Sequence, residues 1–168
     1  MKPQEKVPSL HVDLINDTKW SMEKQDPDKY TMIIFYRGLH CPICKKQLES
    51  LKDNMNEFID RGVNVIAVSM DSEKRAKQAG EEWDIESIPV GFEMTEKQAR
   101  EWGLYLSKGI GDTEPDLFSE PGLFLIKKDG TLYSSSVQTM PFARPAFEDV
   151  LKAIDFIEDK SYPARGEA

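Results

Sequence analysis

The sequence predicts a single α/β domain in which helices flank a central mixed β-sheet. The first observation is an apolar, partly β-branched run at residues 31–36, which suits a strand buried on both faces of a sheet. A helical repeat of apolar residues follows over 43–59, and a second apolar run follows at 63–69. This order predicts a βαβ unit, and a chain of 168 residues is most simply one domain, 1–168, with its core at about 10–157.

The remaining elements follow from local signals along the chain. Pro89 predicts an edge strand, because proline cannot donate to a sheet ladder, and Thr95 with Gln98 forms a capping box at a helix start. Residues 105–120 read as an irregular cover or a disordered loop. In chain order we expect strands at 10–15, 18–22 and 87–92, helices at 72–83 and 95–103, strands at 122–126 and from 131, a helix from 145 to 157, and a frayed polar tail at 158–168.

Both cysteines of the chain lie where the first buried strand gives way to the first long helix, as Cys41-Pro42-Ile43-Cys44. Proline is favoured at the first helical position, which makes Cys41 the N-cap residue. Its sulfur then faces backbone N–H groups and the positive end of the helix dipole, and both favour the thiolate. Such settings lower a thiol pKa from about 8.5 to about 3.5–7.5. We therefore predict that Cys41 is a nucleophile and that Cys44, one turn further on, is its resolving thiol.

Other roles for the two cysteines are a buried structural pair, a zinc site, or an iron–sulfur cluster shared between two chains. Zinc prefers four ligands, and only His11 and His40 remain to complete the set. We expect no metal and no organic cofactor. Replacing Cys41 with serine is predicted to abolish any thiol chemistry.

Two basic side chains flank the nucleophile in the sequence. A positive charge on His40 or Arg37 would lower the thiol pKa further if either side chain points toward the sulfur. The alternatives are solvent exposure for His40 and a surface role for Arg37.

The strand, loop, Cys-x-x-Cys and amphipathic helix resemble the thioredoxin fold. Residues 35–48, Phe-Tyr-Arg-Gly-Leu-His-Cys-Pro-Ile-Cys-Lys-Lys-Gln-Leu, resemble the peroxiredoxin-like branch, the alkyl hydroperoxide reductase/thiol-specific antioxidant superfamily. The resemblance covers about residues 10–157. It implies a central mixed sheet flanked by helices, with an N-terminal strand extension and a helical insert.

The resemblance implies two further site residues. Pro121 matches the position of a cis-proline that faces the sulfurs and binds substrate, which requires a cis Glu120–Pro121 bond; otherwise it is an ordinary strand-opening proline. Arg144 precedes the last helix, and typical peroxiredoxins place an arginine from this half of the chain against the nucleophile. Its alternative is local loop packing.

The chain also departs from both families. Typical peroxiredoxins carry proline and threonine where this chain has Ile34 and Gly38, so the threonine that helps to grip the peroxide is absent. Thioredoxin has a buried aspartate where this chain has Phe35.

We expect a thiol-dependent antioxidant oxidoreductase that reduces peroxides through Cys41, with a thioredoxin-like protein or glutathione as its cytosolic thiol reductant. A thiol–disulfide oxidoreductase acting on protein disulfides is the alternative. A non-enzymatic binding or redox-sensing module is the third possibility. Consumption of hydrogen peroxide, compared with reduction of a protein disulfide, distinguishes the three.

Charge and composition limit which partners and which cellular compartment we expect for the protein. Thirty acidic against 22 basic residues give a net charge of −8, which disfavours nucleic acid and anionic membranes as partners. No apolar run is long enough to span a bilayer, and residues 1–6 lack the apolar segment of a signal peptide. We therefore expect a cytoplasmic protein, in which two cysteines in one motif are catalytic or metal-binding thiols rather than a disulfide framework. A homodimer is compatible with the sequence, although no motif specifies one.

Overall fold

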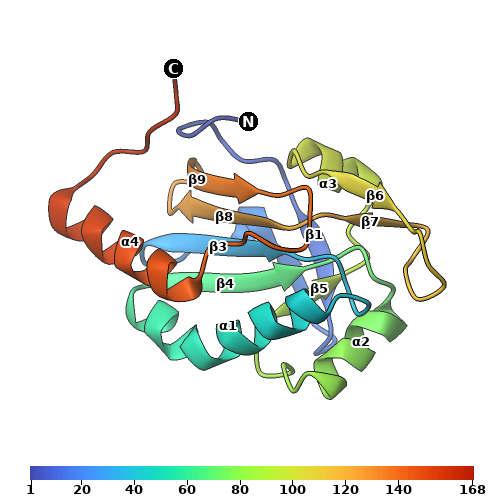
Figure 1. Cartoon of the computed structure of the whole chain (residues 1–168). Coiled ribbons are helices and arrows are strands. Elements are labelled where there is room, and N and C mark those ends of the chain that lie inside the picture. Colours follow the sequence, from blue (N-terminus) through green and yellow to red (C-terminus); the bar gives the residue numbers. More distant parts are fainter.

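The computed structural model describes all residues, 1–168, and its centre is a seven-stranded sheet (Figure 1). The strands are β1 (His11–Leu14), β2 (Lys19–Ser21), β3 (Tyr30–Phe35), β4 (Val63–Val68), β5 (Val90–Phe92), β6 (Leu106–Lys108), β7 (Leu117–Ser119), β8 (Gly122–Lys127) and β9 (Leu132–Val137). The helices are α1 (Pro42–Asp60), α2 (Glu73–Glu82), α3 (Glu96–Glu101) and α4 (Phe147–Lys160), with a short 3₁₀ turn, η1 (Met22–Lys24). The order in the sheet is β2-β1-β5-β4-β3-β8-β9.

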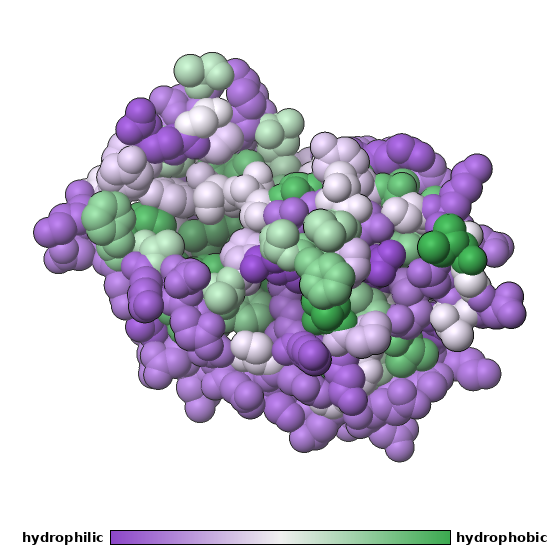
Figure 2. All heavy atoms as spheres, in the orientation of Figure 1, coloured by the Kyte–Doolittle hydropathy of each residue, from purple (hydrophilic) through white to green (hydrophobic).

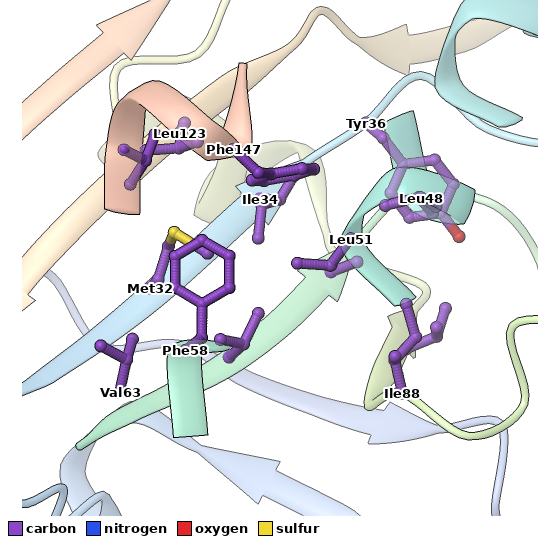
Figure 3. Close-up of a cluster of buried hydrophobic side chains, with 14 of the residues drawn as sticks. Met32, Ile34, Tyr36, Leu48, Leu51, Phe58, Val63, Ile88, Leu123 and Phe147 are labelled. Carbon is purple, nitrogen blue, oxygen red and sulfur yellow. The ribbon is translucent and has the colours of Figure 1, made fainter. Parts of the chain in front are cut away.

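Strand β3 lies inside the sheet and is buried along its whole length. It runs parallel to β4 and antiparallel to β8, which confirms the predicted α/β architecture with a mixed sheet. Because successive side chains of a strand point to opposite faces, Met32 and Ile34 enter one core while Ile33 and Phe35 enter the other. Figure 3 shows the first core, where Met32 and Ile34 lie near residues of α1 and α4.

Helix α1 covers this first core and carries the cysteine motif at its N-terminal end. It begins with Pro42 at the first helical position, as the sequence predicts. It ends at Asp60, and Gly62 follows with φ +73°, a left-handed conformation that glycine adopts without a Cβ penalty. No helix of the chain combines the length and apolarity that crossing a membrane requires.

The structure corrects three expectations about elements. Residues 105–120 are not irregular throughout, because β6 and β7 pair as an antiparallel hairpin; only their connection, residues 109–116, has no regular structure. Strand β5 is not an edge strand but lies between β1 and β4; Pro89 precedes its first residue, so the strand loses no donor. The C-terminal tail is not simply frayed, since Ala164 is buried and its carbonyl accepts a hydrogen bond from Gln4.

Candidate active site

Cys41 occupies the N-cap of α1 in an extended conformation, with φ −108° and ψ 104°. Its Sγ accepts a hydrogen bond from the backbone N–H of Cys44 at 3.1 Å. This is the geometry predicted from Pro42, and it places the sulfur at the positive end of the helix dipole. The local sequence therefore creates a site that stabilises a thiolate.

The two thiols of this motif have opposite acidities. The pKa of Cys41 is lowered to about 6, first by the neighbouring Cys44 thiol and then by the Cys44 backbone N–H and Arg144, against the opposing effect of burial. The pKa of Cys44 is raised, first by burial and then by its hydrogen bond to Cys41. At neutral pH Cys41 is therefore largely ionised while Cys44 keeps its proton, which is the division of roles that a nucleophile and a resolving thiol require.

Arg144 lies against both sulfurs. Its Nη2 is 3.6 Å from Cys41 Sγ and 3.1 Å from Cys44 Sγ. The guanidinium is held in place on its other sides, because Nη1 donates to Gln47 Oε1 at 2.6 Å and Nε donates to the Pro141 carbonyl at 2.6 Å. The position that the resemblance implied for Arg144 thus agrees with the structure.

Gln47 is a residue that sequence reasoning missed. It lies one turn after Cys44 on α1, a spacing that puts the two side chains on the same side of the helix. That spacing is the only signal in the sequence that could have placed Gln47 in the site. It does not predict a role for Gln47, because the role depends on the hydrogen bond from Arg144, which is distant in the sequence.

Both cysteines are buried, with exposed fractions of 1% for Cys41 and 0% for Cys44. They are nevertheless not sealed by apolar side chains, because the polar guanidinium of Arg144 lies over both sulfurs.

Arg37 does not point toward the sulfur and is not a surface residue. Its side chain is 16% exposed, and its Nε lies 3.2 Å from Glu120 Oε2, in a carboxylate side chain that is 4% exposed. The guanidinium also lies over the ring of Phe118, 4.7 Å from the centroid. Arg37 therefore joins the loop before Cys41 to strand β7, and its charge is neutralised by Glu120.

His40 is neither solvent-exposed nor a cation beside the thiolate. Its ring packs on Phe118 with a centroid distance of 4.6 Å, and both ring nitrogens are buried without a hydrogen-bond partner. Burial, followed by the nearby charge of Arg37, lowers the pKa of His40, so the imidazole is neutral at pH 7. No group of three or more histidine, cysteine or acidic side chains is arranged to hold a metal ion.

The expectation of a cis-proline is wrong, because every peptide bond is trans, including Glu120–Pro121. Pro121 is buried in the short link between β7, which ends at Ser119, and β8, which begins at Gly122. The Glu120 N–H donates to the Tyr105 carbonyl, and the Pro121 carbonyl accepts from the Gln138 N–H. Pro121 is therefore a strand-opening proline, the alternative reading of this position.

Asp71 is a second residue that sequence reasoning did not assign to the site. Its carboxylate is fully buried, accepts from the Leu39 N–H at 2.7 Å and from Arg75 Nε at 3.0 Å, and so anchors the loop before Cys41. Gly38 makes this possible, since its φ is +134° and an added Cβ would lie 2.6 Å from Asp71 Oδ1. The neighbouring Ser72 caps α2, because its side chain accepts a hydrogen bond from the Arg75 N–H.

Comparison with solved structures supports the fold. Peroxiredoxin 6 of Arenicola marina, solved as a cysteine-to-serine mutant, aligns with a TM-score of 0.81 at 18% identity and covers 96% of this chain and 75% of its own. The peroxidoxin BcpB of Mycobacterium tuberculosis aligns with a TM-score of 0.73 at 18% identity, over 92% of this chain and 96% of its own.

Comparison with known sequences identifies the family. The mitochondrial thioredoxin-dependent peroxide reductase of Rattus norvegicus is 28% identical over 140 residues, which cover 77% of this chain and 51% of the relative. This chain therefore spans about half the length of the curated relatives that it matches first. The AhpC/TSA family model matches residues 3–135, most of the 168 residues. On this match, the chain belongs to the AhpC/TSA family.

Proposed function

We propose that this protein is a thiol-dependent peroxidase in which Cys41 is the nucleophile and Cys44 the resolving thiol. The observation that carries the proposal is the ionised Cys41 at the start of α1, held by the Cys44 N–H and Arg144 beside a protonated second thiol. Family membership and relatives named as peroxide reductases support it.

In the first step the Cys41 thiolate attacks the terminal oxygen of the peroxide, R–O–OH. The S–O bond forms as the O–O bond breaks, Cys41 becomes a sulfenic acid, and the leaving alkoxide or hydroxide takes a proton from solvent. The Cys41 N–H is not free to bind the peroxide, because it donates to the Gly38 carbonyl at 3.1 Å. With Gly38 in place of the threonine of typical peroxiredoxins, Arg144 is the donor that polarises the peroxide.

In the second step Cys44 attacks the sulfenic sulfur of Cys41. The disulfide forms, the hydroxyl group leaves with the Cys44 proton as water, and an external dithiol then supplies two electrons to restore both thiols. The two residues occupy the N-cap and the first turn of one helix, so this step needs no partner chain.

The burial of the sulfurs favours a peroxide over a protein disulfide as substrate. With exposed fractions of 1% and 0%, the cysteines admit a small oxidant more readily than the backbone of a second protein. Disulfide exchange remains the second candidate, since a Cys-x-x-Cys with one acidic and one protonated thiol also suits that chemistry.

The test is hydrogen peroxide consumption in excess dithiothreitol, run beside reduction of insulin disulfides. We expect peroxide consumption that is lost in Cys41→Ser and a mass decrease corresponding to an intramolecular Cys41–Cys44 disulfide after one equivalent of peroxide. Reduction of insulin without peroxide consumption would replace the peroxidase with the exchanger. Neither activity would favour a binding or redox-sensing module.

The reductant, the compartment and the assembly are part of the same proposal. A thioredoxin-like dithiol is the reductant that the names of the relatives support, with glutathione as the alternative. A reducing, cytoplasmic location suits a chain whose two cysteines must return to thiols. A homodimer stays a prediction, to be tested by light scattering on the purified protein.

A further inference from the structure

We infer that this protein has a second site, remote from its cysteines, that binds a small anion of the phosphate type. The site is a cavity of about 260 Å³ at the end of the sheet where β3 begins and β8 ends. Its lining comes from the N-terminal arm, residues 6–8, from the segment around η1, from β3 and from the turn between β8 and β9. The cysteine motif follows the opposite end of β3, so the inference does not depend on the proposed peroxidase.

The charged side chains that line the cavity are three lysines and two carboxylates: Lys6, Lys127, Lys128, Glu23 and Asp129. Three positive against two negative side chains leave one positive charge in excess. Both carboxylates already have donors close in the sequence, because Ser21 Oγ donates to Glu23 Oε2 at 2.8 Å and the Thr131 hydroxyl donates to Asp129 Oδ1 at 2.6 Å. The ammonium groups are therefore the part of the lining that is free to bind an anion.

The lysines are placed around the cavity without being locked into strong ion pairs. The Lys6 ammonium donates to the Asp129 carbonyl, and Gly130 brings it close, since a Cβ added at this position with φ +79° would lie 3.6 Å from Lys6 Nζ. Figure 1 shows the N-terminal segment beside β9, where the Val7 N–H donates to the Gly130 carbonyl at 3.1 Å. Lys127 and Lys128 pair with Asp129 and Asp26 at 3.6 and 3.3 Å, but these pairs are exposed and so contribute little stability. Each ammonium group keeps further N–H donors for a ligand oxygen.

Thr31 lines the same cavity from β3 and carries an unexplained hydroxyl. The residue is 1% exposed, and its Oγ1 has no hydrogen-bond partner. Buried hydroxyls nearly always have a partner, because burying one alone costs free energy. Valine has a similar shape and would avoid this cost in a strand as apolar as β3. An oxygen of a bound anion would supply the missing partner.

Size and charge limit the ligand. The cavity is smaller than the range of about 300–1,000 Å³ that is usual for organic ligands, so it suits a phosphate group with little attached to it. Ammonium groups bind phosphate as point charges, and a phosphate monoester carries a charge of about −1.5 to −2 at pH 7. The whole chain has a net charge of −8, and Figure 2 shows a largely hydrophilic face, so no general attraction of anions is expected. Binding would require this local group of lysines.

The experiment is an NMR titration of the ¹⁵N-labelled full chain at pH 7 with inorganic phosphate, with glycerol 3-phosphate and with succinate, at constant ionic strength. We expect saturable shifts of the amide signals of Thr31, Lys128 and Gly130 with the two phosphate compounds. Tighter binding of glycerol 3-phosphate would identify a phosphate ester as the ligand, and tighter binding of inorganic phosphate would identify the free ion. Equal affinity for succinate, or no saturable shift, overturns the inference.

Variants test whether the anion lies in the cavity. Lys6→Gln and Lys128→Gln should each raise the Kd for inorganic phosphate about fivefold. The matched control is Lys97→Gln, which removes the same charge from an exposed lysine of α3 outside the cavity and should leave the Kd unchanged. Thr31→Val should raise the Kd about tenfold while the free energy of unfolding stays equal or increases, because only an unpaired hydroxyl is lost.

Two outcomes of the variant series would overturn the inference. A Kd unchanged in Thr31→Val would place the anion on the outer surface, and an equal effect of Lys97→Gln would show nonspecific attraction by charge. None of these measurements uses a cysteine, so a negative result leaves the proposed peroxidase unaffected.

Discussion

Replacing Arg144 with glutamine should raise the pKa of Cys41. The charge lies 3.6 Å from the sulfur, where Coulomb's law with an effective dielectric constant of about 20 gives about 4–5 kcal/mol. Arg144 is only partly buried, so screening by solvent reduces this to about 1.5–3 kcal/mol, and each 1.4 kcal/mol is about one pKa unit. The pKa of Cys41 should therefore rise from about 6 to between about 7 and 8.

The assay is the pH dependence of alkylation of Cys41 by iodoacetamide. In the native protein the rate should rise through a midpoint near pH 6, well below the pKa of about 8.5 of an ordinary thiol. At pH 7 the ionised fraction should fall from about 90% to about 10–50% in Arg144→Gln, so alkylation should slow by about two- to tenfold. Peroxide consumption should fall further, because the variant also loses the donor to the peroxide.

The matched control is Arg100→Gln, an exposed arginine of α3 whose partner is Glu96. Its alkylation profile should match that of the native protein. A midpoint near the ordinary thiol pKa of about 8.5 in the native protein would show that the helix start does not ionise Cys41. An unchanged midpoint in Arg144→Gln would show that the guanidinium does not act on the thiolate.

Three further predictions concern the resolving thiol and the loop before the nucleophile. Cys44→Ser should react with one equivalent of peroxide and accumulate a sulfenic acid that dimedone traps, with no intramolecular disulfide by mass; a disulfide-linked dimer as the main product would contradict this. Gly38→Ala should lower the free energy of unfolding by about 2 kcal/mol in urea titrations, because the methyl group meets the Asp71 carboxylate at a left-handed position; stability within about 0.5 kcal/mol of native would contradict the packing. Glu120→Gln should lower the free energy of unfolding by about 2–4 kcal/mol, since it leaves the mostly buried Arg37 charge unpaired. Unchanged stability with altered activity would refute the role of this ion pair in holding the loop before Cys41.

The parts of the fold that the sequence predicts well are those set by neighbouring residues. Pro42 fixes the start of α1, and with it the N-cap position of Cys41, while Gly62 marks the end of the helix. The buried run of β3 likewise needs no partner to be recognised. These features depend on interactions within a few residues, which is why pattern and capping rules find them.

The features that sequence reasoning missed depend on contacts between distant segments. The strands β6 and β7 pair with each other, although the sequence of this segment predicts an irregular loop. Strand β1 pairs with β5, so β5 is not the edge strand that Pro89 predicts. The hydrogen bond between Gln47 and Arg144 joins positions 97 residues apart. No local pattern reports such a contact, so the position of Arg144 came from family resemblance rather than from the residues around it.

The electrostatics of the site depend on which basic side chains place a positive charge next to the Cys41 sulfur. Three basic side chains were candidates to stabilise the thiolate, but Arg37 is paired with Glu120 and the buried His40 is neutral at pH 7. Arg144 is the one cation that contacts the sulfur. The low pKa of Cys41 then depends on the start of α1, on the Cys44 thiol and on that single guanidinium. In the proposed peroxidase the same guanidinium also polarises the peroxide, so binding of the substrate and ionisation of the nucleophile would be coupled through one side chain.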